Sequence, residues 1–282
     1  MNSNNEQWAV VTGASSGIGR ELALGLQQHG YRVIATARAQ QDIDDLSRLG
    51  LTVIMLELAD ADSVGNAAEQ ILTLCNNNLY ALVNNAAYGQ RGAVEDISRN
   101  ALEQQFAVNL FGTHQLTRAM LPALRHGEGG RIVNISSVLG LVAFPWQGAY
   151  NASKFALEGL TDTLRLELYR SNVGISLIEP GPIRSKFRNN ALNKFSASIN
   201  CTESIHAATY QRIRSYYAAG DHPTPFTGTP AHVLKRVVHA LQSSRPKPRY
   251  YVTLPTYILA TCRRLLPWRL LDRLLHYLGQ QR

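Results

Sequence analysis

The stretch Trp8-Ala9-Val10-Val11-Thr12-Gly13-Ala14-Ser15-Ser16-Gly17-Ile18-Gly19 decides the fold. Its first five residues predict a buried strand, and residues 20–26 (Arg-Glu-Leu-Ala-Leu-Gly-Leu) predict the helix that follows the glycine-rich turn. Glycines let the backbone approach a pyrophosphate, whose charge is stabilised by the free N–H groups and the positive end of the helix dipole. The order of strand, glycine turn and helix therefore predicts a dinucleotide site at the start of the chain.

The rest of the chain repeats the alternation of strand and helix. Apolar runs without alternation, separated by helical patterns, are typical of a parallel sheet that is covered on both faces. The further strand candidates are residues 31–38, Thr52–Leu56, Ala81–Asn84, Arg131–Ile135, Gly174–Ile178 and Arg249–Val252. We therefore predict an α/β, doubly wound Rossmann fold with a seven-stranded parallel sheet. It forms one domain over residues 1–255, and a basic amphipathic helical extension follows over 256–282.

Tyr150 and Lys154 stand four residues apart in a sequence that reads as helix. Positions i and i+4 lie on one helix face, so an ammonium there can reach a phenol. A neighbouring positive charge favours the phenolate, which predicts a lowered pKa for Tyr150 and a group able to transfer a proton. A surface Tyr and Lys on an amphipathic helix would show the same spacing, and only the glycine motif at the other end of the chain favours chemistry.

Two further segments, Leu82–Ala87 and Arg131–Ser137, are short apolar runs that end in polar residues, where strands of a parallel sheet face the ligand crevice. With these four motifs in order, the chain resembles the single-domain short-chain dehydrogenases/reductases from about Trp8 to Val252. The resemblance implies a catalytic tetrad. Its members here are Asn109, Ser137, Tyr150 and Lys154, with Ser137 placed by its distance of thirteen residues before Tyr150.

The resemblance also implies the role of each residue. Tyr150 is the general acid when a carbonyl is reduced and the general base in the reverse reaction, and Ser137 donates a hydrogen bond to the carbonyl oxygen. Lys154 binds the nicotinamide ribose and shifts the pKa of Tyr150, while Asn109 holds a water that connects Lys154 to solvent. Asn109 can also bridge a break in a helix, and the two roles can coexist.

The cofactor predicted for this site is NADP(H). The end of the second strand has no acid to bind a free ribose 2′-hydroxyl, whereas the planar fork of Arg38 can pair with a 2′-phosphate. The resemblance assigns the other cofactor contacts to Gly13, Ser15, Ser16, Gly17, Ile18, Gly19, Glu57, Leu58, Asn84, Ala86, Tyr150, Lys154, Pro180, Gly181, Ile183 and Ser185. Three residues depart mildly from the family pattern: Glu57 for an Asp, Ala87 for a Gly and Ser185 for a Thr.

The composition argues against other classes of site. The three cysteines show no Cys-x-x-Cys pair and the eight histidines no His-x-x-x-His group, so we expect neither disulfides nor a bound metal. We expect a reducing, cytoplasmic location. Residues 1–7 lack the basic-then-apolar order of a secretion signal. The net charge is +8, and ten of the 28 Lys and Arg residues but one of the 20 acids lie from Ala231 onward. No nucleic-acid motif accompanies this charge, so we expect no nucleic acid as partner.

The basic extension over residues 256–282 mixes apolar and basic residues along a helical pattern that Pro267 interrupts. It is too short and too charged to span a bilayer. Two interpretations stay open. The segment rests on an anionic membrane surface, or it packs over the substrate mouth or a partner subunit with its arginines solvated; we favour packing. The resemblance further suggests a homodimer or homotetramer formed through the long helices.

The substrate predicted from the residue types is a lipophilic aldehyde, ketone or alcohol. Specificity is expected in a lid over about residues 182–229, which includes a helix over 204–219. Apolar and aromatic surface near the catalytic groups comes from Val138, Leu139, Phe144, Trp146 and Tyr88, beside Ser137. Residues 155–160 and the basic extension resemble the branch that holds retinol and hydroxysteroid dehydrogenases. Alternatives are a 3-oxoacyl thioester reductase of lipid synthesis, which would dock an acidic carrier on the basic extension, and a dinucleotide sensor without chemistry.

Overall fold

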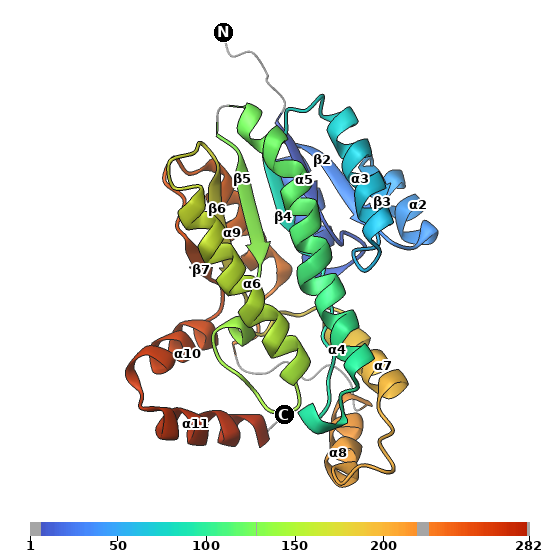
Figure 1. Cartoon of the computed structure of the whole chain (residues 1–282), viewed down its shortest axis with the longest axis vertical. Coiled ribbons are helices and arrows are strands. Elements are labelled where there is room, and N and C mark those ends of the chain that lie inside the picture. The colour runs from blue at the N-terminus through green and yellow to red at the C-terminus, as the bar shows by residue number, and fades with distance from the viewer. Residues whose placement is uncertain (1–6, 128, 219–225, 281–282) are drawn as a thin grey trace.

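A seven-stranded sheet forms the centre of the computed structural model, which describes residues 7–127, 129–218 and 226–280 (Figure 1). All of its strands are parallel, in the order β3-β2-β1-β4-β5-β6-β7. The strands are β1 (Trp8–Val11), β2 (Arg32–Ala37), β3 (Thr52–Met55), β4 (Ala81–Asn84), β5 (Arg131–Ile135), β6 (Gly174–Glu179) and β7 (Arg249–Tyr251). The predicted doubly wound fold with seven parallel strands is confirmed.

Helices cover both faces of this sheet (Figure 1). They are α1 (Gly17–Gln28), α2 (Gln40–Arg48), α3 (Ala61–Leu74), α4 (Arg99–Phe106), α5 (Thr113–His126), α6 (Gly148–Glu167), α7 (Phe187–Ser198), α8 (Ala207–Ala218), α9 (Pro230–Gln242), α10 (Leu254–Leu265) and α11 (Trp268–Gln280). Ala9 and Val11 of β1 belong to the core under α1 and α9, while Val10 between them belongs to the core under α3 and α5. Because neighbouring strand residues point to opposite faces, two buried faces require the unbroken apolar run seen in the sequence.

The glycine turn joins β1 to α1 at the point where the strand order reverses, between β1 and β4. Gly13 and Gly17 adopt positive φ values of 67° and 56°, which residues with a Cβ rarely adopt. A Cβ on Gly13 would also lie 2.8 Å from the Cα of Ala86, which follows β4. The two strand ends can therefore approach closely, and a crevice opens at this switch point.

Helices α10 and α11 lie beyond the end of the sheet, on the side away from the N-terminus (Figure 1). Their inner faces share a buried apolar cluster with the segment that follows β5. The cluster contains Val138, Leu139, Val142, Phe144, Tyr150, Leu259, Leu271 and Leu275. The predicted extension is therefore helical and packs against the body of the same chain. None of the helices in the described part of the chain combines the length and apolar character needed to cross a membrane.

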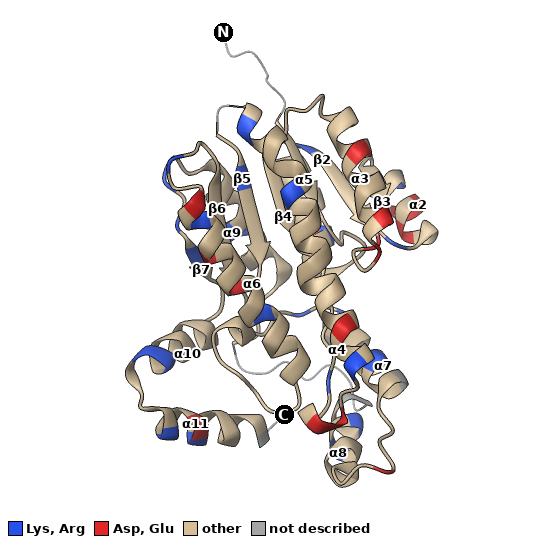
Figure 2. Ribbon diagram, in the orientation of Figure 1, with Lys and Arg blue, Asp and Glu red and all other residues tan. Residues whose placement is uncertain are grey.

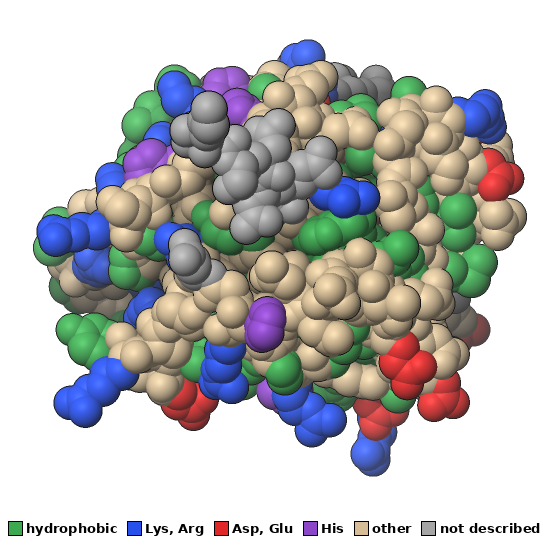
Figure 3. Space-filling view, turned by 90° about the horizontal axis from the view of Figure 1, so that it is seen from above, with side chains coloured by type: hydrophobic (Ala, Val, Ile, Leu, Met, Phe, Trp, Pro, Cys, Tyr) green, Lys and Arg blue, Asp and Glu red, His purple; other side chains and the backbone are tan. Residues whose placement is uncertain are grey.

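Charged side chains are distributed unevenly over these elements. Figure 2 shows Lys and Arg on the loop before β7 and on α10 and α11, whereas Asp and Glu are frequent on α2 and α6, each of which carries three acids. Seen from above, from the end where the N-terminus leaves, positive side chains are scattered among polar and apolar ones (Figure 3). The described residues visible on that face form no continuous basic surface of the kind that follows a nucleic-acid backbone.

Candidate active site

A continuous cavity of about 570 Å³ extends from the glycine turn to Tyr150 along the carboxyl ends of the strands. One end is lined by the turn residues and by Arg38 of the segment after β2. The other end is lined by apolar side chains from the segment after β5 and from α7, α8 and α10. The cavity thus has a polar end suited to a nucleotide and an apolar end beside the predicted catalytic groups.

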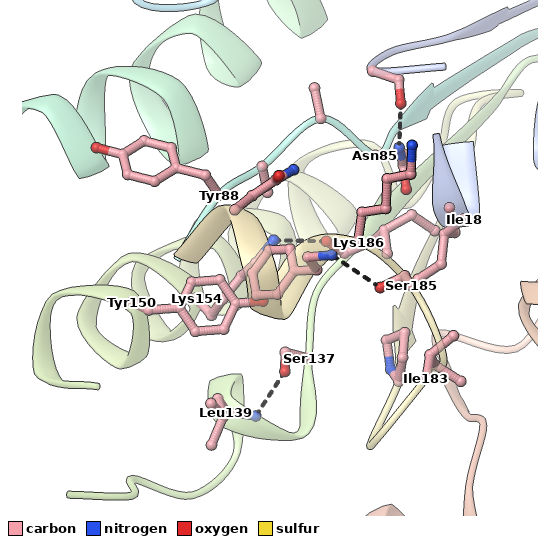
Figure 4. Close-up of a pocket in the computed structure, with 18 of the residues that line it drawn as sticks. Ile18, Asn85, Tyr88, Ser137, Leu139, Tyr150, Lys154, Ile183, Ser185 and Lys186 are labelled. Carbon is pink, nitrogen blue, oxygen red and sulfur yellow. Dashed lines mark hydrogen bonds between the residues drawn. The ribbon is translucent and has the colours of Figure 1, made fainter. Parts of the chain in front are cut away.

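Tyr150 and Lys154 lie in the first two turns of α6 and are both buried, at 7% and 3% exposure. The Lys154 ammonium donates a hydrogen bond of 2.8 Å to the backbone carbonyl of Ile135, at the end of β5. Its Nζ lies 5.8 Å from the centre of the Tyr150 ring, and that ring packs on Phe187 with 5.4 Å between ring centres. Figure 4 shows Tyr150 and Lys154 on the same wall of the cavity, with Ser137 on the segment below them.

Ser137 lies two residues after the end of β5 and precedes a short 3₁₀ turn, Val138–Gly140. Its hydroxyl accepts a hydrogen bond of 3.1 Å from the backbone N–H of Leu139. Burial raises the pKa of Tyr150 to about 12, and a hydrogen bond with Ser137 opposes this rise. Ser137 and Tyr150 can therefore address the same oxygen atom of a substrate, since the two side chains are within hydrogen-bonding reach of each other.

The pKa of Tyr150 is shifted in the direction opposite to the one expected from the sequence. We expected the Lys154 charge to lower the pKa of Tyr150, yet the pKa is raised because desolvation disfavours the phenolate more strongly. Burial also lowers the pKa of Lys154 to about 8, and the negative charge of Glu158 opposes that effect. Both groups are thus shifted toward their neutral forms, an effect of burial that spacing along a helix does not reveal.

Asn109 lies in a π-helical segment, Ala107–Gly112, that joins α4 to α5. Its side chain is buried and binds the loop after β4 at both ends: the amide donates to the Tyr88 carbonyl at 3.0 Å, and its oxygen accepts from the Tyr88 N–H at 3.1 Å. The amide also donates to Ser153 Oγ on α6 at 3.0 Å. The structure therefore places Asn109 within a helix irregularity, where its side chain ties the loop after β4 to α6 and does not line the cavity; its role in holding a water stays a prediction.

The predicted cofactor residues line the cavity with one exception. Those that line it are Gly13, Ser15, Ser16, Gly17, Ile18, Gly19, Arg38, Glu57, Leu58, Ala86, Tyr150, Lys154, Pro180, Gly181, Ile183 and Ser185. Asn84 does not, because its amide is buried and donates hydrogen bonds to Thr117 at 2.9 Å and to Asn134 at 2.8 Å. Asn85 lines the cavity in its place and binds the backbone of Thr12 and Gly13. Asn84 acts as an internal tie between neighbouring strands.

The start of α1 fits a diphosphate. Ser16 precedes the helix but makes no side-chain capping bond, and no acid lies in the first turn. The first N–H groups of the helix are therefore left for an anion, at a turn whose glycines line the cavity. Ala87, the departure from the family's glycine, is not among the described residues with positive φ, so its methyl group is tolerated there.

All six predicted substrate residues, Tyr88, Ser137, Val138, Leu139, Phe144 and Trp146, line the cavity. The helix predicted in the lid over residues 204–219 corresponds to α8, which begins three residues later. Its residues Ile213 and Tyr216 line the cavity. Sequence reasoning missed further lining residues from distant segments: Arg91, Lys186, Phe187, Pro255, Leu259 and Gly279. Lys186 and Phe187 fall within the predicted lid over about residues 182–229, and Leu259 and Gly279 within the predicted extension over 256–282. Their individual contacts with the cavity depend on tertiary packing.

The described residues hold no group of three His, Cys, Asp or Glu side chains arranged to bind a metal. The three cysteines are free, and two of them, Cys75 and Cys201, are buried. The chemistry available at the cavity is therefore that of a phenol, a hydroxyl and an amine beside an extended nucleotide site.

Comparison with known proteins agrees with this architecture. Residues 7–195 match the family model of the short chain dehydrogenases. The chain is 43% identical over 267 residues to the uncharacterized oxidoreductase YbbO of Escherichia coli, covering 94% of this chain and 93% of YbbO. It is 34% identical over 254 residues to human retinol dehydrogenase 8, covering 85% and 79% of the two chains.

Solved structures of similar fold include complexes with either nicotinamide dinucleotide. A short chain dehydrogenase of Burkholderia cenocepacia in complex with NADP is 26% identical and superposes with a TM-score of 0.73, covering 97% of this chain and 99% of its own. A short chain dehydrogenase/reductase of Burkholderia phymatum in complex with NAD is 27% identical, with a TM-score of 0.73 and 94% of each chain covered. Together with the family match, these similarities show that the chain belongs to the short-chain dehydrogenase family of oxidoreductases.

Proposed function

We propose that this protein interconverts a lipophilic aldehyde or ketone and its alcohol with NADP(H) as cofactor. The observation that carries the proposal is one cavity in which Ser137, Tyr150 and Lys154 stand between the glycine turn and an apolar wall. The glycine turn and the uncapped start of α1 can hold the diphosphate, and the buried Lys154 amine can hold the nicotinamide ribose. A nicotinamide dinucleotide bound there supplies or accepts the hydride.

The protein's own residues manage the proton and the developing charge. In reduction, Tyr150 gives its phenolic proton to the carbonyl oxygen, while the Ser137 hydroxyl donates a hydrogen bond to the same oxygen. In alcohol oxidation, Tyr150 accepts that proton back. The raised pKa of Tyr150, about 12 because of burial, suits a proton donor. The phenol therefore stays protonated at neutral pH, and the charge of Lys154 assists whenever the phenolate must form.

The preference for NADP(H) rests on Arg38. Its side chain is 68% exposed at the nucleotide end of the cavity, where the end of β2 has no acid to repel a 2′-phosphate, although Asp42 on α2 also lines the cavity. A guanidinium can bind a phosphate through two parallel hydrogen bonds. Glu57 takes part in the same region by pairing with Arg38 at 3.3 Å. Relatives of similar fold bind NADP or NAD, so the choice in this chain is read from its own residues.

The lipophilic substrate class rests on the far wall of the cavity. Leu139, Phe144, Phe187 and Leu259 surround the position beyond Tyr150, which disfavours a sugar or a small charged acid. The similarity to retinol dehydrogenase 8 is consistent with such a substrate. A 3-oxoacyl thioester is the second candidate, because Arg91 and Lys186 also line the cavity and could meet an anionic group. A sensor without chemistry is disfavoured by the gathering of all three reactive side chains.

The decisive experiment compares Tyr150→Phe with the native protein. Removal of the hydroxyl deletes the transferable proton and little volume, so NADPH binding should persist while turnover of long-chain aldehydes, retinal and keto-steroids falls by about a thousandfold or more. Tyr169→Phe, at an 84% exposed position, controls for the substitution itself. Substantial activity in Tyr150→Phe would reject the assignment, and a native protein that consumes NADPH with no member of the panel would favour the sensor.

Assembly and location follow as further proposals. We propose that copies associate through α5 and α6, because α6 exposes Phe155, Leu160 and Leu166 on its outer side. A homodimer or homotetramer would bury these side chains, and light scattering at several concentrations would measure the mass. A cytoplasmic location stays a prediction of the sequence.

A further inference from the structure

A short 3₁₀ turn in the segment after β4 is fastened to the start of α8 by two acidic side chains. Asp96 accepts hydrogen bonds from Ser204 Oγ at 2.6 Å and from the Tyr210 hydroxyl. The carboxylate of Glu95 is hydrogen-bonded to His206, with 2.6 Å between Oε1 and Nε2. These five side chains join two segments that are far apart in the sequence, and we call them the clasp.

Tyr210 is the best-fixed member of the clasp, because its side chain is fully buried. Its hydroxyl donates to Asp96 and accepts from the backbone N–H of Ala93 at 3.0 Å, so it is satisfied both as donor and as acceptor. Its ring meets the ring of Phe195 on α7 edge to face, with 5.0 Å between ring centres. A ring packed in an apolar cluster and a hydroxyl with two partners leave α8 little room to shift.

Trp146 connects the clasp to the cavity, which its side chain lines. The His206 ring lies edge to face with the indole, with 5.0 Å between ring centres, and the Tyr210 ring lies 6.3 Å away. Trp146 has a φ of 64°, which residues with a Cβ rarely adopt, and its carbonyl accepts from the Gly92 N–H at 3.0 Å. Such a backbone persists only where its surroundings hold it, so the position of the indole depends on its neighbours.

The clasp acts from outside the cavity. Neither His206 nor Tyr210 is among the described residues that line it, whereas Trp146 lines it together with Ile213 and Tyr216 of α8. Ile213 and Tyr210 belong to one buried apolar cluster, and Trp146 packs against that cluster. Nothing in the reaction proposed above uses the clasp directly. Its contacts reach the cavity through the side chains that it fixes.

We propose that His206 and Tyr210 are positioning residues that act through Trp146: they fix its indole and the adjoining face of α8, and so set the width of the apolar end of the cavity. The proposal rests on the proposed function for its meaning, because the body of the carbonyl substrate would occupy that end. A wall held by hydrogen bonds and ring contacts discriminates between substrates by shape. Its physical content, a fixed indole, is measurable without any substrate.

The direct test measures how far Trp146 is accessible to a quencher. The chain has three tryptophans, so Trp8→Phe together with Trp268→Phe leaves Trp146 as the only one. In this parent protein, His206→Ala should raise the acrylamide quenching constant about twofold or more, because the ring packed against the indole is removed. His114→Ala, at an exposed position on α5, is the matched control and should leave the constant unchanged. A constant equal to that of the parent in His206→Ala, or equal rises in both variants, would overturn the proposal.

Tyr210→Phe covers a His206→Ala protein that fails to fold. It keeps the buried ring and removes only the hydroxyl that donates to Asp96, so the fold should tolerate the change while α8 loses part of its fastening. We expect the quenching constant of Trp146 to rise in this variant too. Tyr169→Phe, at an exposed position, is its matched control. A Tyr210→Phe protein with the quenching constant of the parent would overturn the proposal.

Kinetics separate a widened cavity from a damaged protein. His206→Ala should raise the KM for a long-chain aldehyde about threefold or more, with kcat and the NADPH dissociation constant within about twofold of native values, because the glycine turn lies at the other end of the cavity. An unchanged KM, or an NADPH affinity that falls by the same factor, would overturn the proposal. An absence of carbonyl reduction by the native protein would count against the proposed function alone, and an unchanged Trp146 quenching constant against the clasp alone.

Discussion

Arg38 and Glu57 form an ion pair, 3.3 Å between Nη1 and Oε2, across the nucleotide end of the cavity. The two side chains are 68% and 38% exposed, so their attraction is weak and is screened by salt. A 2′-phosphate that binds Arg38 must compete with Glu57 or share the guanidinium with it. Glu57 also accepts a hydrogen bond from the Ala59 N–H at 3.1 Å, which keeps its carboxylate in the region when Arg38 turns away.

Substitution of this pair should separate the two cofactors. Arg38→Ala is expected to weaken NADPH binding about tenfold or more and to leave NADH binding within about twofold, because only NADPH carries the phosphate. Glu57→Gln should tighten NADPH binding by about threefold by freeing Arg38. Fluorescence titration measures both constants. Arg48→Ala, which breaks an exposed pair on α2, is the control, and equal losses for both nucleotides in Arg38→Ala would contradict the assignment.

The pH dependence of carbonyl reduction should follow Lys154 before Tyr150. The pKa of Lys154 is lowered to about 8 by burial, and that of Tyr150 is raised to about 12 by burial. Reduction should therefore be level up to about pH 8 and decline above it as the amine loses its charge, although the phenol remains protonated. Initial rates at saturating NADPH from pH 6 to 10 test this. A rate that stays level to pH 10 would show that the Lys154 charge is dispensable.

Lys154 should also leave a signature in stability. Its folded pKa of about 8 lies below the ordinary value of 10.5, so between those values the unfolded chain binds more protons than the folded one. Stability associated with this group must then rise as the pH increases from about 8 to 10.5. Lys154→Met should remove this rise. Urea unfolding of both proteins at pH 7 and at pH 10 measures it, and a native-to-variant difference that does not change with pH would contradict the burial penalty.

Gly279 near the end of α11 packs on the loop beside the cavity, and a Cβ there would lie 2.5 Å from Pro145 Cγ. Gly279→Ala should push the helix end away and raise the KM for apolar carbonyls several-fold, while NADPH binding is unchanged. Gly159→Ala on α6 is the control, because a Cβ at that position meets nothing within 4 Å. Steady-state kinetics with a long-chain aldehyde measures the effect. An unchanged KM would show that the substrate does not depend on α11.

Contact with a membrane stays open and can be tested on the outer side of the extension. Leu265 and Trp268 flank the turn between α10 and α11 at 75% and 64% exposure, and the Arg263 guanidinium lies 3.9 Å from the Trp268 ring centre. If this turn rests on lipid, the double change Leu265→Ser and Trp268→Ser should reduce sedimentation with vesicles of anionic phospholipid about tenfold. Leu166→Ser on α6 is the control. If the native protein does not bind the vesicles, the extension packs on the body of the chain without contacting a membrane.

Most of the fold could be predicted from the sequence because each buried strand must be apolar along its whole length. Strand β1 shows why, since successive residues of this strand belong to apolar cores on opposite faces of the sheet. The reactive groups could be placed because they follow strand ends or occupy one helix face. Asn84 and Asn85 show the limit. Asn84 ends β4 and Asn85 follows it, and only tertiary contacts decide that the first ties strands together while the second reaches the cavity. Burial likewise reversed the expected pKa shift of Tyr150.

The two ends of the cavity come from different parts of the chain, with the glycine turn near the start and Leu259 and Gly279 near the end. Random mutagenesis confined to residues 254–280 is therefore expected to alter which substrates the protein accepts while leaving the glycine turn intact. Such a library is a practical starting point for directed evolution of new substrate ranges. The separate origin of the two cavity ends also gives a physical reason why related enzymes can differ in substrate and still bind the same coenzyme.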